Sequence, residues 1–258
     1  MTGINGPAPD LQLRPPPQQE VVESLKKRPL WSTACCDHEI SEVMLVNPAT
    51  ICDKDERDET PAARDCDSDR MARARKTFHA VHFYKDPQSL SQVAASFLCE
   101  GIGNGERVVV VSTPTHLAAI VKAVERRGVD LVELKKRGKW LAFDARRTLS
   151  TLITARRIDL RRFKTQFTDV VGDWYKSEPA LSMRAYGEMV DLLYREGDIA
   201  AALKLEELWT DLAALHKFPL LCAYAVSSFH EEPSGSSRFS DVCRCHSHVI
   251  GAIPQRAS

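Results

Sequence analysis

The stretch "SMRAYGEMVDLLYREG" at residues 182–197 decides the fold, because it can form one helix or a strand that leads into a helix. As one helix, it would hold Arg184 and Glu188 four residues apart, as an exposed ion pair worth about 0.2–0.5 kcal/mol. Gly187 opposes a single helix, since glycine inside a helix costs about 1 kcal/mol relative to alanine. We therefore expect a strand over 181–186 and a helix that begins at Glu188.

The segments around this stretch show the same alternation of strands and helices. Strands are expected where apolar residues alternate or run together, at 78–84, 107–113, 140–145 and 218–226. Helical spacing covers 90–102, 116–128 and 146–176, and a short amphipathic element is expected at 239–249. The continuous run "RVVVVST" is typical of a strand that is buried on both faces of a parallel sheet. The pattern predicts an α/β domain with a mainly parallel central sheet and helices on both faces.

The N-terminal part of the chain has a different composition. Residues 53–76 contain eight acidic and seven basic residues with almost no apolar residues between them. Such a segment cannot bury enough apolar surface to offset its ordering entropy. We expect a largely disordered N-terminal arm at 1–75, with a short apolar element near 43–46, a folded domain at 76–250 and a tail at 251–258.

Composition excludes several classes of protein. Lysine plus arginine and aspartate plus glutamate number 35 each, so the net charge of zero does not indicate a nucleic acid or a membrane as partner. The N-terminus lacks the apolar core of a secretory signal, and the chain has no run of 18 apolar residues that could span a bilayer. Without a secretory signal, the eight cysteines are expected to be reduced thiols in a cytoplasmic protein.

Several words of the sequence, in this order, resemble one known family. They are "HAVHFY", "RAYGEMVDLLYREGDIAAALKLEELW", "FPLLCAY" and "CRCHSHVI". Their order and spacing resemble the MEDS domain, a sensory domain named from methanogen and methylotroph proteins that include a dichloromethane-responsive regulator. The resemblance covers about residues 77–250. It implies a fold related to the RecA and circadian-clock ATPases, a small hydrocarbon derivative as ligand, and a kinase or transcription regulator as protein partner.

A phosphate-binding loop is the first feature that an ATPase relative would need. It would lie between the first strand and its helix, where this chain has "YKDPQSLS" at 84–91. This segment has no glycine that would let backbone N–H groups surround a phosphate, and no Lys-Ser/Thr pair for the γ-phosphate and Mg²⁺. The glycine-rich "GIGNGE" at 101–106 ends a helix, which predicts a helix stop and a tight turn. We expect a degenerate phosphate loop, no ATPase activity, no catalytic residues and no cofactor.

A ligand site is expected where the predicted strands end. Read as strand, turn and helix, the opening stretch places Glu188 at the carboxyl edge of the sheet, where open α/β folds bind ligands. Six residues are expected to line this site: His82, Tyr84, Arg184, Glu188, Glu206 and Trp209. Alternatives remain open, since the charged residues can form a structural Arg–Glu network and a histidine at a sheet edge can be structural. His79 lies on the opposite strand face from His82.

Two clusters of cysteine and histidine raise the question of a metal site. The first candidates are Cys243, Cys245, His246 and His248. A second cluster contains Cys35, Cys36 and His38, and the two together could supply a tetrahedral site. Neither spacing is the C-x₂-C type that characterises zinc sites. We therefore expect free thiols and a partly buried C-terminal helix rather than a metal site.

A cluster of basic residues is the remaining candidate feature. Residues 134–164 contain eleven lysines and arginines and only two acidic residues. The segment could bind an anion or nucleic acid, but no DNA-binding motif accompanies it. The favoured interpretation is a solvated face that is balanced by acidic residues at 188–211.

The sequence thus predicts a non-enzymatic, cytoplasmic sensory domain that binds a small, partly apolar ligand and signals to a protein partner. One alternative is a nucleotide-binding RecA-like protein. Another is a nucleic-acid or protein adaptor that uses the basic segment 135–164. Neither a membrane nor nucleic acid is expected as a partner, and a homo-oligomer remains open.

Overall fold

The computed structural model describes residues 45–46, 78–154, 157–168, 171–172, 182–229 and 236–251. The predicted arm at 1–75, apart from residues 45–46, and the tail after residue 251 lie outside these residues. Within the described residues, no helix combines the length and the apolar character that crossing a membrane requires.

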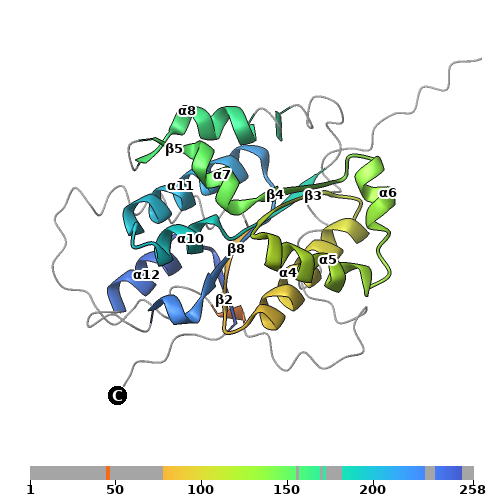
Figure 1. The fold of residues 1–258 in the computed structure, drawn as a ribbon, viewed down its shortest axis with the longest axis horizontal. Coiled ribbons are helices and arrows are strands. Elements are labelled where there is room, and N and C mark those ends of the chain that lie inside the picture. The colour runs from red at the N-terminus through yellow and green to blue at the C-terminus, as the bar shows by residue number, and fades with distance from the viewer. Residues whose placement is uncertain are drawn as a thin grey trace, which may run out of the picture. The chain divides into compact units, whose positions relative to one another are not determined.

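A seven-stranded sheet forms the centre of the described part of the chain (Figure 1). In sequence order its strands are β1 (Leu45–Val46), β2 (His79–Tyr84), β3 (Arg107–Ser112), β4 (Trp140–Asp144), β7 (Met183–Gly187), β8 (Leu220–Ala225) and β9 (His248–Gly251). In space they follow the order β1-β9-β2-β8-β7-β3-β4, and all neighbours are parallel except β1 and β9. The predicted α/β fold with a mainly parallel sheet is therefore confirmed.

Helices pack on both faces of the sheet (Figure 1). One face is covered by α4 (Pro87–Gly103) and α5 (Pro114–Glu125), which pack against each other. The other face contacts α7 (Ala145–Leu152), α8 (Leu160–Phe163), α10 (Met189–Arg195), α11 (Ile199–His216) and α12 (Ser236–Arg244). A short helix, α6 (Leu131–Lys136), precedes β4. This layering explains why every residue of β2, β3, β7 and β8 is buried.

The stretch at 182–197 forms a strand followed by a helix, as predicted. β7 ends at Gly187 and α10 begins at Met189, so that Glu188 is the residue that joins them. β7 lies between β3 and β8, with Val111 opposite Gly187 in the register. Glu188 therefore follows a central strand at the carboxyl edge of the sheet.

The prediction of continuous helical spacing over 146–176 was wrong. A small hairpin of β5 (Ile153–Thr154) and β6 (Arg157–Ile158) separates α7 from α8. The β-branched pair in β5 favours strand geometry. Asp159 then starts α8, because its carboxylate accepts hydrogen bonds from the backbone N–H groups of Arg161 and Arg162. A π-helical turn at Lys164–Thr168 follows, and residues 173–181 lie outside the described residues.

The amphipathic element expected at 239–249 is partly a helix and partly a strand. Helix α12 ends at Arg244, and β9 then joins the sheet next to β2, with Val81 opposite Val249. A strand of four residues is too short to show a clear period of two in the sequence. The apolar element expected near 43–46 does form a strand, β1, which pairs with β9.

Candidate functional site

The carboxyl ends of four neighbouring parallel strands bring polar residues together at one edge of the sheet. The strands are β2, β8, β7 and β3, which end at Tyr84, Ala225, Gly187 and Ser112. Glu188 comes directly after β7. Because the strands are parallel, their ends share one edge, which is where open α/β folds place their ligands. We refer to Tyr84, Ser112, His116, Glu188 and Asp191 as the edge site.

The carboxylate of Glu188 is the centre of the edge site. It is only 2% exposed, and it accepts hydrogen bonds from the Ser112 hydroxyl at 2.9 Å and from the backbone N–H of Thr113. Its other oxygen lies 2.7 Å from Nδ1 of His116. Thr113 is the N-cap of α5, so the carboxylate lies at the positive end of that helix dipole.

His116 connects Glu188 with solvent. Its side chain is 16% exposed, whereas that of Glu188 is buried. The hydrogen bond that His116 donates to Glu188 raises the pKa of His116 above 6.5, although burial opposes this shift. The imidazole also meets the ring of Tyr84 edge-on, with 5.8 Å between ring centroids. His116 therefore covers the buried carboxylate at the protein surface.

A second buried carboxylate, Asp191, lies beside this pair. Tyr84 donates its hydroxyl hydrogen to Asp191 at 3.0 Å, and Asp191 also accepts from the Ala225 backbone N–H and the Ser228 hydroxyl, both at 3.1 Å. Burial raises the pKa of Asp191, and these hydrogen bonds oppose the shift. The pKa of Tyr84 is raised by burial and by Asp191, so the phenol remains a donor.

Arg184 does not take part in the edge site. Its guanidinium donates to Glu106 at 2.8 Å and to Glu100 at 2.9 Å, and it lies 4.7 Å from the centroid of the Phe97 ring. Burial opposes its charge, but the two glutamates raise the pKa of Arg184 above its usual value. A Cβ at Gly101 would lie 2.7 Å from Nε of Arg184, so glycine is required for this close approach. Arg184 thus forms a structural Arg–Glu network, but with Glu100 and Glu106 rather than with Glu188 and Glu206.

The remaining sequence-predicted residues lie in separate environments. His82 is 2% exposed on the same strand face as Tyr84, with the two ring centroids 6.3 Å apart, and burial lowers its pKa to about 4. Trp209 packs among aromatic rings, with centroids 5.4 Å from Phe163 and 4.7 Å from Phe167. The structure thus brings Tyr84 and Glu188 to the edge site, with His82 next to Tyr84, and places Trp209 in the hydrophobic core.

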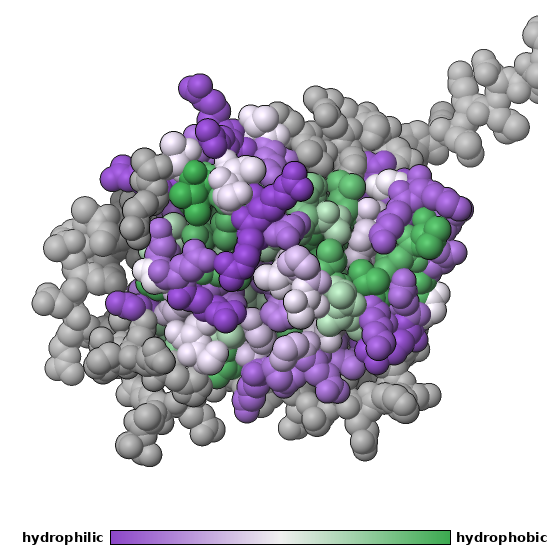
Figure 2. All heavy atoms as spheres, viewed as in Figure 1, coloured by the Kyte–Doolittle hydropathy of each residue, from purple (hydrophilic) through white to green (hydrophobic). Residues whose placement is uncertain are grey.

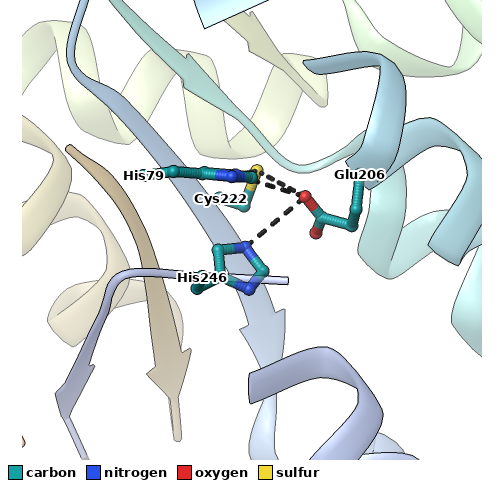
Figure 3. Close-up of side chains that lie close together, drawn as sticks. All are labelled: His79, Glu206, Cys222 and His246. Atoms are coloured by element: carbon teal, nitrogen blue, oxygen red, sulfur yellow. Dashed lines mark hydrogen bonds and ion pairs between the residues drawn. The ribbon is translucent and has the colours of Figure 1, made fainter. Parts of the chain in front are cut away.

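Glu206 belongs to a second polar group, on the sheet face that α11 covers (Figure 3). We call His79, Glu206, Cys222 and His246 the buried cluster. Oε2 of Glu206 lies 3.3 Å from Nε2 of His79, 3.4 Å from Nε2 of His246 and 3.3 Å from Sγ of Cys222. None of the four residues is more than 3% exposed.

Charge in the buried cluster is strongly perturbed. Burial lowers the pKa of His79 to about 4, and His246 adds to this effect. Burial opposes the ionisation of Glu206, but His246 and His79 together hold its pKa below the usual range. Burial and the charge of Glu206 raise the pKa of the Cys222 thiol. A carboxylate therefore lies among groups that water does not reach.

The cysteine–histidine cluster near the C-terminus contributes one residue to the buried cluster. His246 is that residue, whereas His248 begins β9 and contacts the Ser247 hydroxyl at 2.8 Å. Cys245 donates to the backbone carbonyl of Asp241, and Cys243 is part of the hydrophobic core. The companion candidates Cys35, Cys36 and His38 lie outside the described residues.

Sequence reasoning missed four residues of these two groups: His116, Asp191, His79 as a partner of Glu206, and Cys222 as more than a core residue. A signal was present for His116, because "STPTH" follows a buried strand and contains a Thr-Pro helix start. No local signal identifies the buried cluster, because its residues come from four elements far apart in the sequence.

The basic residues of 134–164 lie at the surface in the described part of the segment. Several pair with acidic residues, as in Arg137 with Glu133 at 2.6 Å and Arg146 with Glu196 at 3.1 Å. Figure 2 shows a face that is mostly hydrophilic, with apolar surface between the charged side chains. These ion pairs are what a solvated and charge-balanced face requires.

Comparison with protein families identifies the chain. The family model described as the methanogen/methylotroph, DcmR sensory domain (MEDS) matches residues 78–247, which is most of the part that the structure describes. No curated protein matches the chain. The match spans every strand from β2 to β8 and every residue of both the edge site and the buried cluster. The chain belongs to the MEDS family of sensory domains.

Proposed function

We propose that this sensory domain binds a small, partly apolar ligand at the edge site and passes a conformational signal to a protein partner. The observation that carries the proposal is the covering of a buried carboxylate, Glu188, by the partly exposed imidazole of His116. A ligand that displaces the imidazole would meet two carboxylates, Glu188 and Asp191, and the face of Tyr84. We therefore expect a ligand with a hydrogen-bond donor, such as an alcohol or amine group, on a short apolar body.

The same geometry supplies a route for the signal. Glu188 connects the end of β7 with the start of α5 through Ser112 and Thr113, and it immediately precedes α10. A ligand that competes for Glu188 would loosen the contact between these elements. Since a ligand shifts a conformational equilibrium only as far as its affinity for the two states differs, this change of partners is the source of the signal.

The start of α4 disfavours nucleotide binding at the position where a phosphate loop would lie. Asp86 caps this helix, and its carboxylate accepts the backbone N–H of Ser89 at 2.8 Å. The aspartate thus occupies the helix end that a phosphate loop would leave for a phosphate, and two negative charges would repel there. This contact supports a binding role without ATP hydrolysis.

The test begins with the full chain purified from its own host. Native mass spectrometry would identify a carried ligand by its mass, and a thermal-shift screen of short alcohols, amines and halogenated methanes would identify exchangeable ones. For any compound that raises Tm, the ligand concentration that gives half of the maximal shift should be at least about tenfold higher for Glu188→Gln and for His116→Asn than for the wild type. Glu207→Gln, at a partly exposed position on α11, is the matched control. An unchanged shift in both edge-site variants would exclude this site.

A further inference from the structure

The ligand atoms of the buried cluster converge closely enough to surround one metal ion (Figure 3). The four atoms all lie within 4.8 Å of one another, and the close pairs are separated by 3.3–3.4 Å. Zinc binds imidazole nitrogen and carboxylate oxygen at about 2.0–2.1 Å and thiolate sulfur at about 2.3 Å, which gives ligand-to-ligand distances of about 3.3–3.8 Å in a tetrahedron. Four of the six pairs match these distances, and the other two, from Nε2 of His246 to the atoms of His79 and Cys222, lie within 4.8 Å. A small shift of the His246 ring would therefore complete the tetrahedron.

When the two imidazoles are neutral, hydrogen bonds to their far nitrogens leave both Nε2 atoms without hydrogens. Thr210 donates its hydroxyl hydrogen to the Glu206 backbone carbonyl, so its oxygen accepts at 2.9 Å from Nδ1–H of His79. Nδ1 of His246 lies 2.7 Å from the Val242 carbonyl, which can only accept. In the neutral imidazoles, each Nε2 therefore presents a lone pair to the carboxylate of Glu206.

The interior of the cluster thus contains more acceptors than hydrogens. Two nitrogen lone pairs and Oε2 of Glu206 face one another, and the thiol of Cys222 supplies one hydrogen. Nε2 of His246 is buried and meets no hydrogen-bond partner among the described residues. Buried acceptors that face one another without a hydrogen are unfavourable, and a cation at their centre satisfies all of them.

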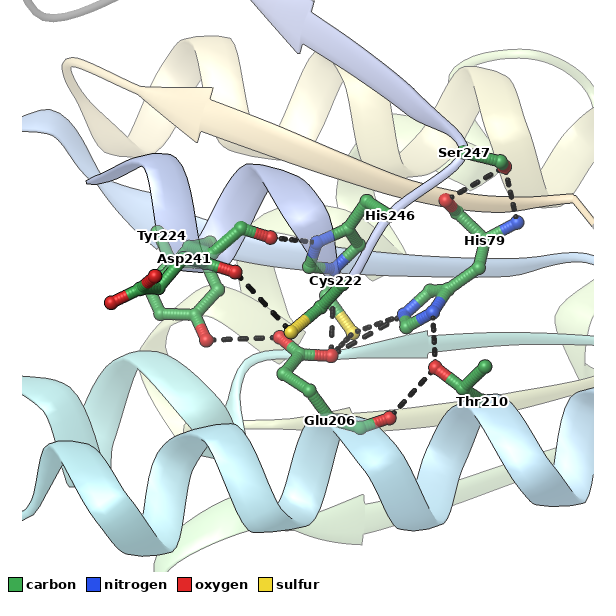
Figure 4. Close-up of polar contacts among 10 residues, drawn as sticks. His79, Glu206, Thr210, Cys222, Tyr224, Asp241, His246 and Ser247 are labelled. Carbon is green, nitrogen blue, oxygen red and sulfur yellow. Dashed lines mark hydrogen bonds and ion pairs between the residues drawn. The ribbon is translucent and has the colours of Figure 1, made fainter. Parts of the chain in front are cut away.

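Outer hydrogen-bond partners hold three of the four ligands in position, as Figure 4 shows. Thr210 and the Val242 carbonyl fix the two rings, and the Tyr224 hydroxyl donates to the other oxygen of Glu206 at 2.9 Å. Metal-binding histidines and carboxylates commonly have such outer partners, which orient the ligand and select the tautomer.

We propose that His79, Glu206, Cys222 and His246 bind a divalent transition-metal ion, with Zn²⁺ as the expected occupant. Two imidazoles, one carboxylate and one thiolate form a borderline-soft set that suits zinc. Four protein ligands fill a tetrahedron and leave no position for substrate, so the ion is structural. It joins β2, α11, β8 and the segment between α12 and β9, and it is independent of the ligand proposed for the edge site.

The first experiment measures the metal directly in the full chain. Elemental analysis and native mass spectrometry should find one zinc ion per chain after purification without chelators. After chelation, reloading with Co²⁺ should give the intense visible bands of tetrahedral cobalt and a near-ultraviolet thiolate charge-transfer band. A wild-type protein that gains only the weak spectrum of octahedral cobalt, or that binds no zinc, would overturn the proposal.

Paired variants then assign the ligands. Cys222→Ser should abolish the charge-transfer band, whereas Cys99→Ser on α4 should keep it. His246→Gln should lower zinc affinity at least about a hundredfold, whereas the nearby His248→Gln should leave it unchanged. Tyr224→Phe, which alters only an outer partner, should lower affinity about 10–100-fold.

One further variant separates this site from the N-terminal cysteines. A chain with Cys35→Ser and Cys36→Ser should keep one zinc ion and the full cobalt spectrum. If this variant lost the spectrum while Cys222→Ser kept it, the ion would belong to the N-terminal segment and the proposal would be wrong. Should Cys222→Ser or His246→Gln fail to fold, the wild-type spectrum and Tyr224→Phe still decide the outcome.

Discussion

The edge site and the buried cluster each contain a buried glutamate that faces histidine, but they differ in their supply of hydrogens. Glu188 meets a hydroxyl, a backbone N–H and an imidazole that solvent reaches, so each of its oxygens is matched by a donor. Glu206 meets two imidazoles whose hydrogens are engaged elsewhere. A satisfied carboxylate near solvent can exchange partners, whereas an enclosed group with few hydrogens is stabilised by the cation that we propose for it. The comparison therefore separates a site for exchange from a site for stability.

The largest difference between the two glutamates should appear in stability. Glu206→Ala should lower the free energy of unfolding by about 3–5 kcal/mol, because removing one partner leaves buried polar groups without compensation. Glu207→Ala, at an exposed ion pair with Lys204 on the same helix, should change it by less than about 1 kcal/mol. Urea denaturation measures both values. A cost below about 1 kcal/mol for Glu206→Ala would remove the distinction between the two sites.

Removal of Glu188 should have a smaller effect. Glu188→Ala leaves the Ser112 hydroxyl and the Thr113 N–H without their acceptor, which should cost about 1–3 kcal/mol. Glu188→Gln retains an amide oxygen and should recover part of this loss. Chemical denaturation of the two variants together with the wild type provides the measurement. Equal losses of stability in both variants would show that the hydrogen bonds accepted by the Glu188 side chain do not stabilise the fold.

The pH dependence of stability should report on the contact between His116 and Glu188 in the edge site. Glu188 raises the folded-state pKa of His116 above 6.5, and Asp191, Arg195 and Tyr84 face the same imidazole. A raised histidine pKa contributes stability that is fully present below the unfolded-state pKa and is lost as pH rises through the folded-state pKa. Tm should therefore fall as pH rises from about 6.5. His116→Asn and Glu188→Gln should each reduce that fall, and a wild-type slope in both would contradict this assignment.

The smallest expected effect is the coupling between the two glutamates. Among the described residues, the two side chains share no hydrogen-bond or ion-pair partner, and they lie at the carboxyl edge and on the α11-covered face of the sheet, respectively. The losses from Glu188→Ala and Glu206→Ala should therefore add, with a coupling energy below about 0.5 kcal/mol in a double-mutant cycle. A larger coupling would mean that the two sites communicate through the sheet.

The sequence predicted the features that depend on local pattern. The apolar runs of β2, β3 and β8 and the glycine that ends β7 were sufficient for the sheet and for the position of Glu188. Strand β9 and the hairpin within 146–176 were not predicted, because strands of four and two residues are too short to show the alternation of apolar and polar residues that identifies a strand.

Spatial neighbours were predictable only where the topology dictates them. Tyr84 and Glu188 meet because parallel strands share their carboxyl edge, but Glu206 turns to His79 rather than to Glu188. That choice depends on the rotation of α11 about its axis, which the spacing of its apolar residues did not determine. Arg184 likewise pairs with Glu100 and Glu106, and no spacing in the sequence indicates these partners.

The order of the chain gives the buried cluster a particular place in biosynthesis. His79 is the first residue of β2 and His246 comes just before β9, so the cluster draws on both ends of the segment matched by the family. Glu206 and Cys222 leave the ribosome before His246 does, and the carboxylate cannot complete its set of partners until then. A nascent chain that stops short of residue 246 would have to bury an incomplete set of charges. The cluster can therefore be completed only after synthesis has passed residue 246.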